Sequence, residues 1–311
     1  FIDYGLLEAY IQKIYSGHEK KVNKDVVIST WQSIYKFPKK YFEQFGCVIG
    51  DEAHLFKAKS LTSIMSKLHL CKYRFGLTGT LDDLQTHKLV LEGLFGTVNK
   101  VISTKELIEK KTLANLKIDS LILGYKEQEC KDVKNLKYAD EMDYIVTHKK
   151  RLSFITNLLG NVKGNVLVLY QFVEKHGKPL YDTIKEKYKN RNVFFVSGSV
   201  DALDREKIRE ISEKTNNAVI VASYGTFSTG INIKNLHNII FSSPSKSKIR
   251  VLQSIGRGLR LNDNKEMCKL FDIADDLTYK GKQNFTLRHF MERINIYNEE
   301  QFDYTIHRIN I

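Results

Sequence analysis

The chain has 311 residues, a length that allows two domains with separate hydrophobic cores. Hydrophobic residues make up 42% and charged residues 27%, as is typical of soluble globular proteins, and no apolar run approaches the ~18 residues of a membrane helix. The net charge of +13 favours a polyanionic partner, most often nucleic acid. Four widely spaced cysteines, without a C-x-x-C pair, exclude a disulfide framework and a zinc site of that kind, so we expect reduced, mostly buried thiols in a cytoplasmic protein.

The first hundred residues alternate patterns of helix and strand. Apolar residues at helical spacing predict helices over residues 7–17 and 61–68, and short apolar runs predict strands at residues 26–28, 47–49 and 73–77. Such alternation is typical of α/β domains with a parallel sheet, in which ligands bind at the carboxyl ends of the strands.

The segment at residues 35–42 interleaves aromatic side chains with lysines. Lys39 and Lys40 are therefore candidates for following a phosphate backbone while neighbouring rings stack on bases. The alternative is a surface loop whose aromatic side chains turn into the core.

Two adjacent carboxylates, Asp51 and Glu52, follow the predicted strand at residues 47–49. A pair of acids at a strand end suits nucleotide hydrolysis, in which one acid holds Mg²⁺ and the other orients and deprotonates the attacking water. Asp51 would then be the metal ligand and Glu52 the base. The alternative is a solvated pair that caps a following helix, because acids favour helix N-termini.

A second α/β domain is predicted after a polar linker at residues 105–115. Further strands are expected at residues 117–125, 166–169, 193–196, 218–222, 239–241 and 270–273, with helices between most of them and a charged loop at residues 126–138. A helix follows from residue 287, and residues 302–311 fit strand or helix. We expect a partial first domain at residues 1–111, a second at 112–285 and a C-terminal helical extension at 286–311.

The segment at residues 251–260 contains two arginines, Arg257 and Arg260, flanked by glycines. Three residues apart on a helix, the two side chains would project from one face. An arginine pair beside a transferring phosphoryl group neutralises the charge that develops in the transition state. The alternative is a basic helix that faces solvent or nucleic-acid phosphate, but this leaves the cost of two helical glycines, about 1 kcal/mol each, unexplained.

These segments together resemble the motifs of superfamily 2 helicases. Residues 51–54 (DEAH) resemble motif II, residues 78–80 (TGT) motif III, residues 166–172 motif IV, residues 222–232 motif V and residues 253–260 (QSIGRGLR) motif VI. Residues 29–32 resemble the strand-end motif that touches the nucleic-acid backbone. Over residues 26–235 the chain is most similar to phage helicases of DNA repair and recombination. The resemblance implies two RecA-like parallel-sheet domains, the first incomplete, with ATP bound between them and DNA crossing both.

The resemblance also implies roles for single residues. His54, Thr78 and Thr80 would couple the nucleotide site to the opposite domain, and Gly230 and Gln253 would face the nucleotide. The nucleic-acid contacts would come, apart from Lys39 and Lys40, from Thr30, Trp31, Tyr170, Gln171, Tyr224 and Lys248. ATP and Mg²⁺ are the implied cofactors, and branched DNA such as forks, junctions and RNA–DNA loops is the implied partner. We expect a monomer that acts without a membrane, in the host cytoplasm if a phage encodes it.

Two features depart from the family pattern. Asn232 stands where many relatives have an aspartate, and the phosphate-binding loop G-x-x-x-x-G-K-[ST] is absent, since the pairs Gly177-Lys178 and Gly281-Lys282 do not fit it. With no methionine at residue 1 either, we expect a helicase fragment that is inactive alone. The alternatives are a DNA-binding or annealing module without ATPase activity, and a translocase coupled to a nuclease, for which we see no carboxylate–lysine cluster.

Overall fold

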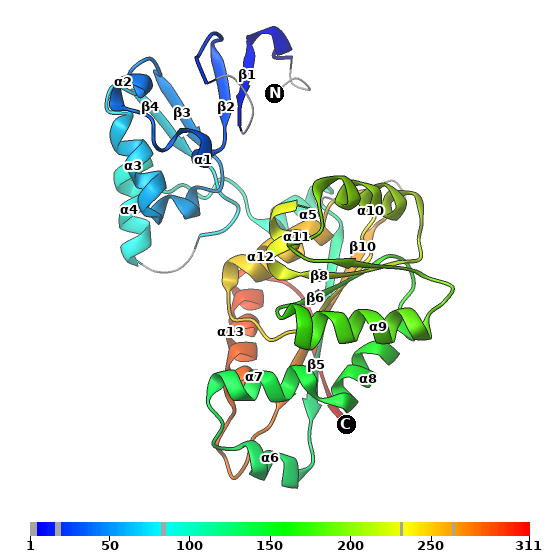
Figure 1. Cartoon of the computed structure of the whole chain (residues 1–311). Coiled ribbons are helices and arrows are strands. Elements are labelled where there is room, and N and C mark those ends of the chain that lie inside the picture. Colours follow the sequence, from blue (N-terminus) through cyan, green and yellow to red (C-terminus); the bar gives the residue numbers. More distant parts are fainter. Residues whose placement is uncertain (1–4, 16–19, 82–84, 231–232, 263–264) are drawn as a thin grey trace. The chain divides into compact units, whose positions relative to one another are not determined.

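A computed structural model describes residues 5–15, 20–81, 85–230, 233–262 and 265–311. The chain forms two compact units, Phe1–Asn99 and Lys100–Ile311 (Figure 1). The division falls before the predicted linker, because that segment forms helix α5 (Thr104–Glu109), whose Ile108 packs on the core of the second unit. Among the described residues, no helix is both long and apolar enough to cross a bilayer.

The first unit contains two parallel strand pairs. Its elements are β1 (Ile11–Ile14), β2 (Val26–Ser29), α1 (Trp31–Ile34), α2 (Lys39–Phe42), β3 (Cys47–Gly50), the 3-10 helix η3 (Ala53–Lys57), α3 (Lys59–Lys67), β4 (Tyr73–Gly76) and α4 (Gln85–Phe95). β1 pairs with β2, and β3 pairs with β4. The helix predicted over residues 7–17 is wrong: Ile11 and Ile14 are buried in β1, since pairing with β2 outweighs a four-residue helical pattern.

The aromatic segment of the first unit folds inward. Phe42 is 1% exposed in a core that includes α3, and Phe37 and Tyr41 pack against that core. Lys39 and Lys40 remain exposed on α2. The structure therefore favours the alternative in which the rings serve the core, while leaving both lysines available at the surface.

The second unit is built on a seven-stranded, wholly parallel sheet in the order β11-β5-β10-β9-β6-β8-β7. Its strands are β5 (Asn115–Gly124), β6 (Val166–Tyr170), β7 (Asn192–Val196), β8 (Ala218–Ser223), β9 (Asn238–Phe241), β10 (Met267–Asp276) and β11 (Tyr304–Asn310). Its further helices are α6 (Glu127–Val133), α7 (Tyr138–Thr147), α8 (Lys149–Leu158), the π-helix η5 (Val173–Gly177), α9 (Lys178–Lys187), α10 (Ala202–Lys214), α11 (Tyr224–Gly230), α12 (Lys248–Gly258) and α13 (Phe285–Glu299). The predicted parallel α/β class is confirmed.

Helices cover both faces of this sheet. Leu167 and Leu169 of β6 face the core beneath α10–α13, and Val166 and Val168 face the core beneath α8 and α9. Strands buried on both faces read as continuous apolar runs, which is why they were visible in the sequence.

The C-terminal segment is part of the second unit and not an extension. α13 buries Phe290 and Tyr297 in the main core, and β11 pairs with β5 along its whole length. The charged segment predicted as a loop at residues 126–138 instead contains α6, which begins after Lys126. Of the four free cysteines, only Cys47 is exposed.

Candidate nucleotide and nucleic-acid site

The DEAH segment lies at the carboxyl end of β3, beside the end of β4. The backbone N–H of Leu77 donates to the Gly50 carbonyl at 2.8 Å, and the N–H of Ala53 donates to the Leu77 carbonyl at 2.8 Å. These bonds continue the β3–β4 pairing beyond the strands. They bring the carboxylates of residues 51–52 next to the TGT segment, as the motifs predict.

Glu52 has an unusual backbone conformation, with φ 50° and ψ 50°. A non-glycine residue in this left-handed region costs about 1 kcal/mol or more, and such strain concentrates at functional sites. Glu52 precedes η3 in sequence, yet its side chain makes no capping hydrogen bond. The Glu52 side chain is 45% exposed, and the Asp51 carboxylate accepts the neighbouring N–H of Glu52 at 2.9 Å. The helix-capping alternative is therefore not supported.

His54 joins the two motifs. Its Nδ1 lies 3.0 Å from Thr78 Oγ1 and 3.2 Å from Glu52 Oε2, while the side chain is 7% exposed. The Thr78 hydroxyl donates to the Thr80 carbonyl at 3.0 Å and accepts the Thr80 N–H at 3.2 Å. Because the single Thr78 proton is used there, His54 Nδ1 must donate, which makes Glu52 and Thr78 alternative acceptors for one N–H.

The position of Asp51 is compatible with a role in holding a magnesium ion. Mg²⁺ is held in nucleotide sites by one or two carboxylates, water and substrate phosphates, so a single exposed carboxylate at a strand end suffices. Among the described residues, no group of three or more His, Cys, Asp or Glu side chains is arranged so that it could hold a metal ion.

In the second unit, α12 carries Gln253 and Arg257. α12 ends at Gly258, so Arg260 lies beyond the helix and does not share a helical face with Arg257, contrary to the prediction. The Arg257 guanidinium lies over the Phe227 ring of α11, 5.4 Å from its centre. This contact places Arg257 against the motif V helix, which ends at Gly230. Asn232 lies outside the described residues.

The two glycines of α12 have different surroundings. A Cβ on Gly258 would lie 2.5 Å from Ile239 Cδ1 and 2.8 Å from Cys268 Sγ, so Gly258 allows the helix to pack on the sheet. A Cβ on Gly256 would meet nothing within 4 Å. Only Gly256 is thus left for the close approach of another group.

Lys265 is a residue that the sequence analysis missed. It is 3% exposed, and its ammonium donates to the carbonyls of Gly258, Arg260 (3.0 Å) and Lys234 (3.3 Å). Burial lowers the pKa of this lysine. It fixes the chain around Arg260 to the segment that follows motif V, and no motif marks it in the sequence.

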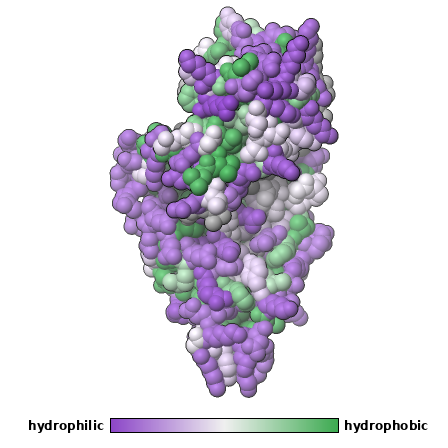
Figure 2. Space-filling view, turned by 90° about the vertical axis from the view of Figure 1, so that its left-hand side faces the viewer, coloured by the Kyte–Doolittle hydropathy of each residue, from purple (hydrophilic) through white to green (hydrophobic). Residues whose placement is uncertain are grey.

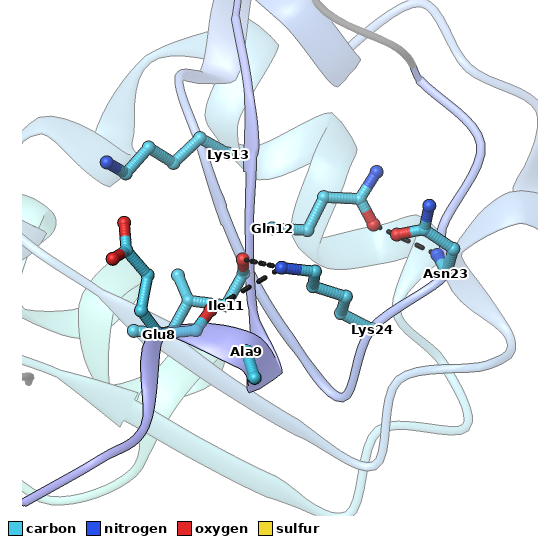
Figure 3. A pocket seen from close by; sticks show the side chains of 7 residues that line it. All are labelled: Glu8, Ala9, Ile11, Gln12, Lys13, Asn23 and Lys24. Carbon is cyan, nitrogen blue, oxygen red and sulfur yellow. Dashed lines mark hydrogen bonds between the residues drawn. The ribbon is translucent and has the colours of Figure 1, made fainter.

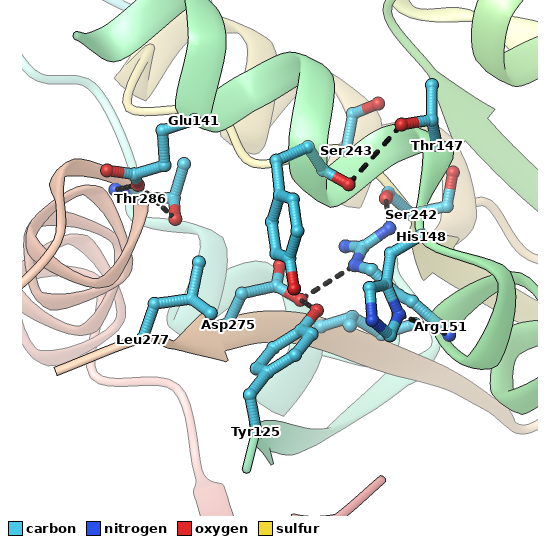
Figure 4. Close-up of polar contacts among 12 residues, drawn as sticks. Tyr125, Glu141, Thr147, His148, Arg151, Ser242, Ser243, Asp275, Leu277 and Thr286 are labelled. Atoms are coloured by element: carbon cyan, nitrogen blue, oxygen red, sulfur yellow. Dashed lines mark hydrogen bonds and ion pairs between the residues drawn. The ribbon is translucent and has the colours of Figure 1, made fainter. Parts of the chain in front are cut away.

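The loop before α12 is held by two buried arginines. Arg151 is paired with Asp275 (Nε–Oδ1 2.7 Å) and donates to the Ser242 carbonyl at 2.8 Å, as Figure 4 shows. Arg293 is paired with Asp272 (Nη2–Oδ1 2.8 Å) and donates to the Ser245 carbonyl at 2.9 Å. Burial and the Asp275 carboxylate raise the pKa of Tyr125, whose hydroxyl donates to Asp275 at 2.7 Å.

The predicted nucleic-acid residues differ in accessibility. Thr30, Trp31 and Gln171 are exposed. Tyr170 and Tyr224, however, are 0% and 4% exposed, and their hydroxyls donate to the carbonyls of Val196 and Ser243 at 3.1 Å. These two rings belong to the core because each ends or follows a strand buried on both faces, so the predicted contact of Tyr170 and Tyr224 with DNA is not supported.

Lys248 has a partner within the unit. Its ammonium lies 2.6 Å from Glu299 of α13, and its side chain is 20% exposed. Any contact of Lys248 with DNA would compete with this ion pair.

A hollow of about 570 Å³ lies in the first unit beside β1 (Figure 3). The Lys24 ammonium in its wall donates to the Ile11 carbonyl at 3.0 Å, and Gln12 Nε2 donates to the Lys21 carbonyl at 2.7 Å. No predicted site residue lines the hollow, so it is separate from the DEAH segment.

Comparison with known proteins agrees with the motifs. Residues 4–83 match the family described as "Type III restriction enzyme, res subunit", and residues 150–262 match the "Helicase conserved C-terminal domain". The chain is 37% identical, over 329 aligned positions, to the ATP-dependent DNA helicase UvsW of Enterobacteria phage T4. The resemblance to superfamily 2 helicases is confirmed.

These helicases are longer than the chain. The alignment with T4 UvsW covers 100% of the chain and 65% of the relative, and the probable helicase D10 of Escherichia phage T5 is 26% identical over 84% of the chain and 55% of the relative. The crystal structure of T4 UvsW superposes with a TM-score of 0.56 at 36% identity, covering 98% of the chain and 63% of that structure. The fold is thus that of RecA-like helicase domains.

Proposed function

We propose that the chain is the motor part of an ATP-dependent DNA helicase or translocase that acts on branched DNA in recombination and repair. This proposal rests mainly on the conformation and contacts of Glu52. Its backbone is strained, its side chain does not cap the following helix, and its exposed carboxylate competes with Thr78 for the same His54 N–H. Glu52 would deprotonate the attacking water, and Asp51 would hold Mg²⁺ with the ATP phosphates.

His54 would report the state of the nucleotide site to the TGT segment. When the Glu52 carboxylate takes up the water proton, it becomes a poorer acceptor, and the His54 N–H is left to Thr78 alone. Thr78 in turn holds the backbone of Thr80 through two hydrogen bonds. The pair of acceptors around His54 therefore offers a direct link between hydrolysis and the shape of the loop after β4.

Arg257 and Arg260 would neutralise charge on the transferring phosphoryl group. Arg257 is oriented by Phe227, and the chain around Arg260 is fixed by Lys265. Gln253 lies one helical turn before Arg257 on α12, and Gly230 ends the neighbouring α11, so both would contact the same nucleotide.

A hydrolytic enzyme of this family also needs the phosphate loop that these 311 residues lack. We expect no ATP hydrolysis by the 311-residue chain, and DNA-stimulated hydrolysis by a protein in which the chain is joined to a preceding segment that supplies that loop, here called the loop-bearing protein. The experiment measures phosphate release by both proteins with and without DNA. Hydrolysis by the isolated chain would contradict this part of the proposal, and inactivity of both would favour a DNA-binding or annealing module.

DNA binding is proposed from the net charge and from the exposed Lys39, Lys40 and Gln171. Charge reversal at both lysines should weaken binding and flatten its salt dependence by about 0.7–0.9 in log–log slope per lost phosphate contact. Competition between a forked DNA and a plain duplex tests the preference for branched DNA. Gel filtration tests the expected monomer.

A further inference from the structure

A compact basic projection stands where β5 and β10 end in the second unit. We call residues 126–137 and 277–282 the basic tip; they include α6, which lies at the lower end of that unit in Figure 1. The tip holds six exposed lysines and three acids. The lysines are Lys126, Lys131, Lys134, Lys137, Lys280 and Lys282. Figure 2 shows that hydrophilic side chains cover this end.

The parallel sheet places the tip on the same edge as the proposed DNA contact at Gln171. Phe241 of β9 pairs with both Leu169 and Asp272, so these residues stand at one level in the sheet. β10 continues for four more residues to Asp276, which carries the tip about 13 Å beyond that level at roughly 3.3 Å per residue. A nucleic acid bound along this carboxyl edge would therefore meet the tip.

The tip is rigid enough to present its charges in fixed positions. Cys130 and Leu277 are buried together with Ile145, and Tyr279 packs on them. The N–H and carbonyl groups of Tyr279 and Lys282 bond to each other at 3.2 and 3.0 Å, closing a two-residue turn. The Lys282 ammonium also bonds Asn135 Oδ1 at 3.2 Å, which joins the two halves of the tip.

The turn contains an unfavourable lysine. Lys280 and Gly281 have φ values of 46° and 81°, as a type I′ turn requires, and glycine, asparagine or aspartate normally occupy the first of these positions. The Lys280 ammonium extends over the Tyr279 ring at 5.7 Å, and Lys134 approaches the same ring at 5.2 Å. Lysine at this turn position is thus less favourable for the backbone than asparagine or glycine, and the Tyr279 ring holds two ammonium groups close together at the apex of the tip.

The acids of the tip do not neutralise these lysines. Glu129 accepts from His148 and from the backbone of Lys126, and Asp132 accepts from Gln128. Within the described ranges, no carboxylate lies within 4.0 Å of any of the six ammonium groups. The lysines are thus open to an external anion.

We propose that the basic tip, with Lys280 and Lys282 at its apex, binds the phosphate backbone of the DNA that lies along the carboxyl edge of the sheet. This inference rests on the proposed DNA-dependent function and extends its binding surface to a segment outside the helicase motifs. Lysines arranged around an aromatic ring suit binding of the phosphate backbone without sequence preference.

The test compares two double variants with equal charge change in the 311-residue chain. K280E/K282E alters the tip, and K163E/K189E alters exposed lysines in the loops before β6 and β7, at the opposite edge of the sheet. Binding of a fluorescein-labelled forked DNA is titrated at several KCl concentrations. We expect K280E/K282E to lower the log–log salt slope by about 1–2, and K163E/K189E to leave it nearly unchanged. Equal losses in both variants, or no loss in K280E/K282E, would overturn the inference.

A third variant separates binding from folding. K280N removes the charge and supplies a residue that tolerates positive φ, so the thermal midpoint should stay or rise while DNA affinity falls. If the unmodified chain binds DNA strongly and K280N and K280E/K282E bind it equally well, the inference about the basic tip is rejected and the proposed function is not affected. If the unmodified chain does not bind DNA at all, both the inference about the basic tip and the proposed DNA-dependent function are rejected.

Discussion

Gly256 and Gly258 stand two residues apart in α12, and their surroundings predict opposite responses to a methyl group. Gly258→Ala should destabilise the protein by about 1–3 kcal/mol, because the new Cβ would overlap Ile239 and Cys268. Gly256→Ala should stabilise it by up to about 1 kcal/mol through helix propensity. Urea unfolding measures both changes. If Gly256 leaves room for nucleotide, the Gly256→Ala variant of the loop-bearing protein should hydrolyse ATP more slowly despite its greater stability.

His176 predicts a pH dependence of stability. Burial, aided by Arg151, lowers its pKa from 6.5 to about 3, and its Nδ1 bonds Ser243 Oγ at 2.9 Å. The unfolded chain binds this proton below its own pKa, whereas the folded chain does not, so stability falls as the pH drops from about 6.5 towards 3. Between about pH 7 and pH 5.5 this residue should account for about 1 kcal/mol. His176→Gln should remove that part of the pH dependence, and an unchanged slope in urea unfolding would contradict the assignment.

Substitution of Arg257 or Arg260 tests whether these side chains neutralise the charge that develops on the phosphoryl group in the transition state. Alanine at either position should reduce ATP hydrolysis by the loop-bearing protein about 10³-fold or more, with DNA affinity nearly unchanged. Weaker DNA binding with a flatter salt slope, and little effect on hydrolysis, would instead assign these arginines to DNA phosphate.

At the scale of elements, the pairing of β11 with the sheet predicts that two isoleucines of this strand contribute differently to stability. Ile309 packs on the core beneath α8 and α9, whereas Ile306 is 47% exposed. Ile309→Ala should cost about 1–2 kcal/mol of unfolding free energy and Ile306→Ala less than about 0.5 kcal/mol. Equal, negligible effects would mean that the C-terminal segment does not belong to the sheet.

The strands of the second unit were predictable, but several connections were not. Residues 166–170 and 218–222 form continuous apolar runs, so the local sequence is enough to predict that these strands are buried on both faces. β1 was missed because its pairing with β2, twelve residues later, is not visible in a four-residue pattern. α6 was missed because its charged sequence gains stability from the small core around Cys130.

The candidate site also has some features that the sequence predicts and others that it does not. Asp51, Glu52, His54 and Thr78 lie together as their motifs predict, because parallel strands end at one edge. The burial of Tyr170 and the role of Lys265 could not be predicted, since both depend on contacts between distant segments.

At the scale of the whole molecule, the motif residues divide between two units. The acids and the TGT segment belong to Phe1–Asn99, and the arginines belong to Lys100–Ile311. In the proposed mechanism the acids and the arginines serve one hydrolytic step. Glu52 and Arg257 variants should therefore impair the same step, and their double variant should be little slower than either single variant.

DNA-stimulated ATP hydrolysis by the Glu52→Gln form of the loop-bearing protein is the most direct test of the proposed mechanism. Glutamine keeps the size of the side chain but cannot accept a proton from water, and Glu43→Gln, an exposed acid of α2's C-terminal end, provides the matched control. We predict that Glu52→Gln lowers the rate by about 10³-fold or more while ATP binding persists, and that the control is unaffected. A Glu52→Gln protein that hydrolyses ATP within a few-fold of the unmodified rate would contradict the account.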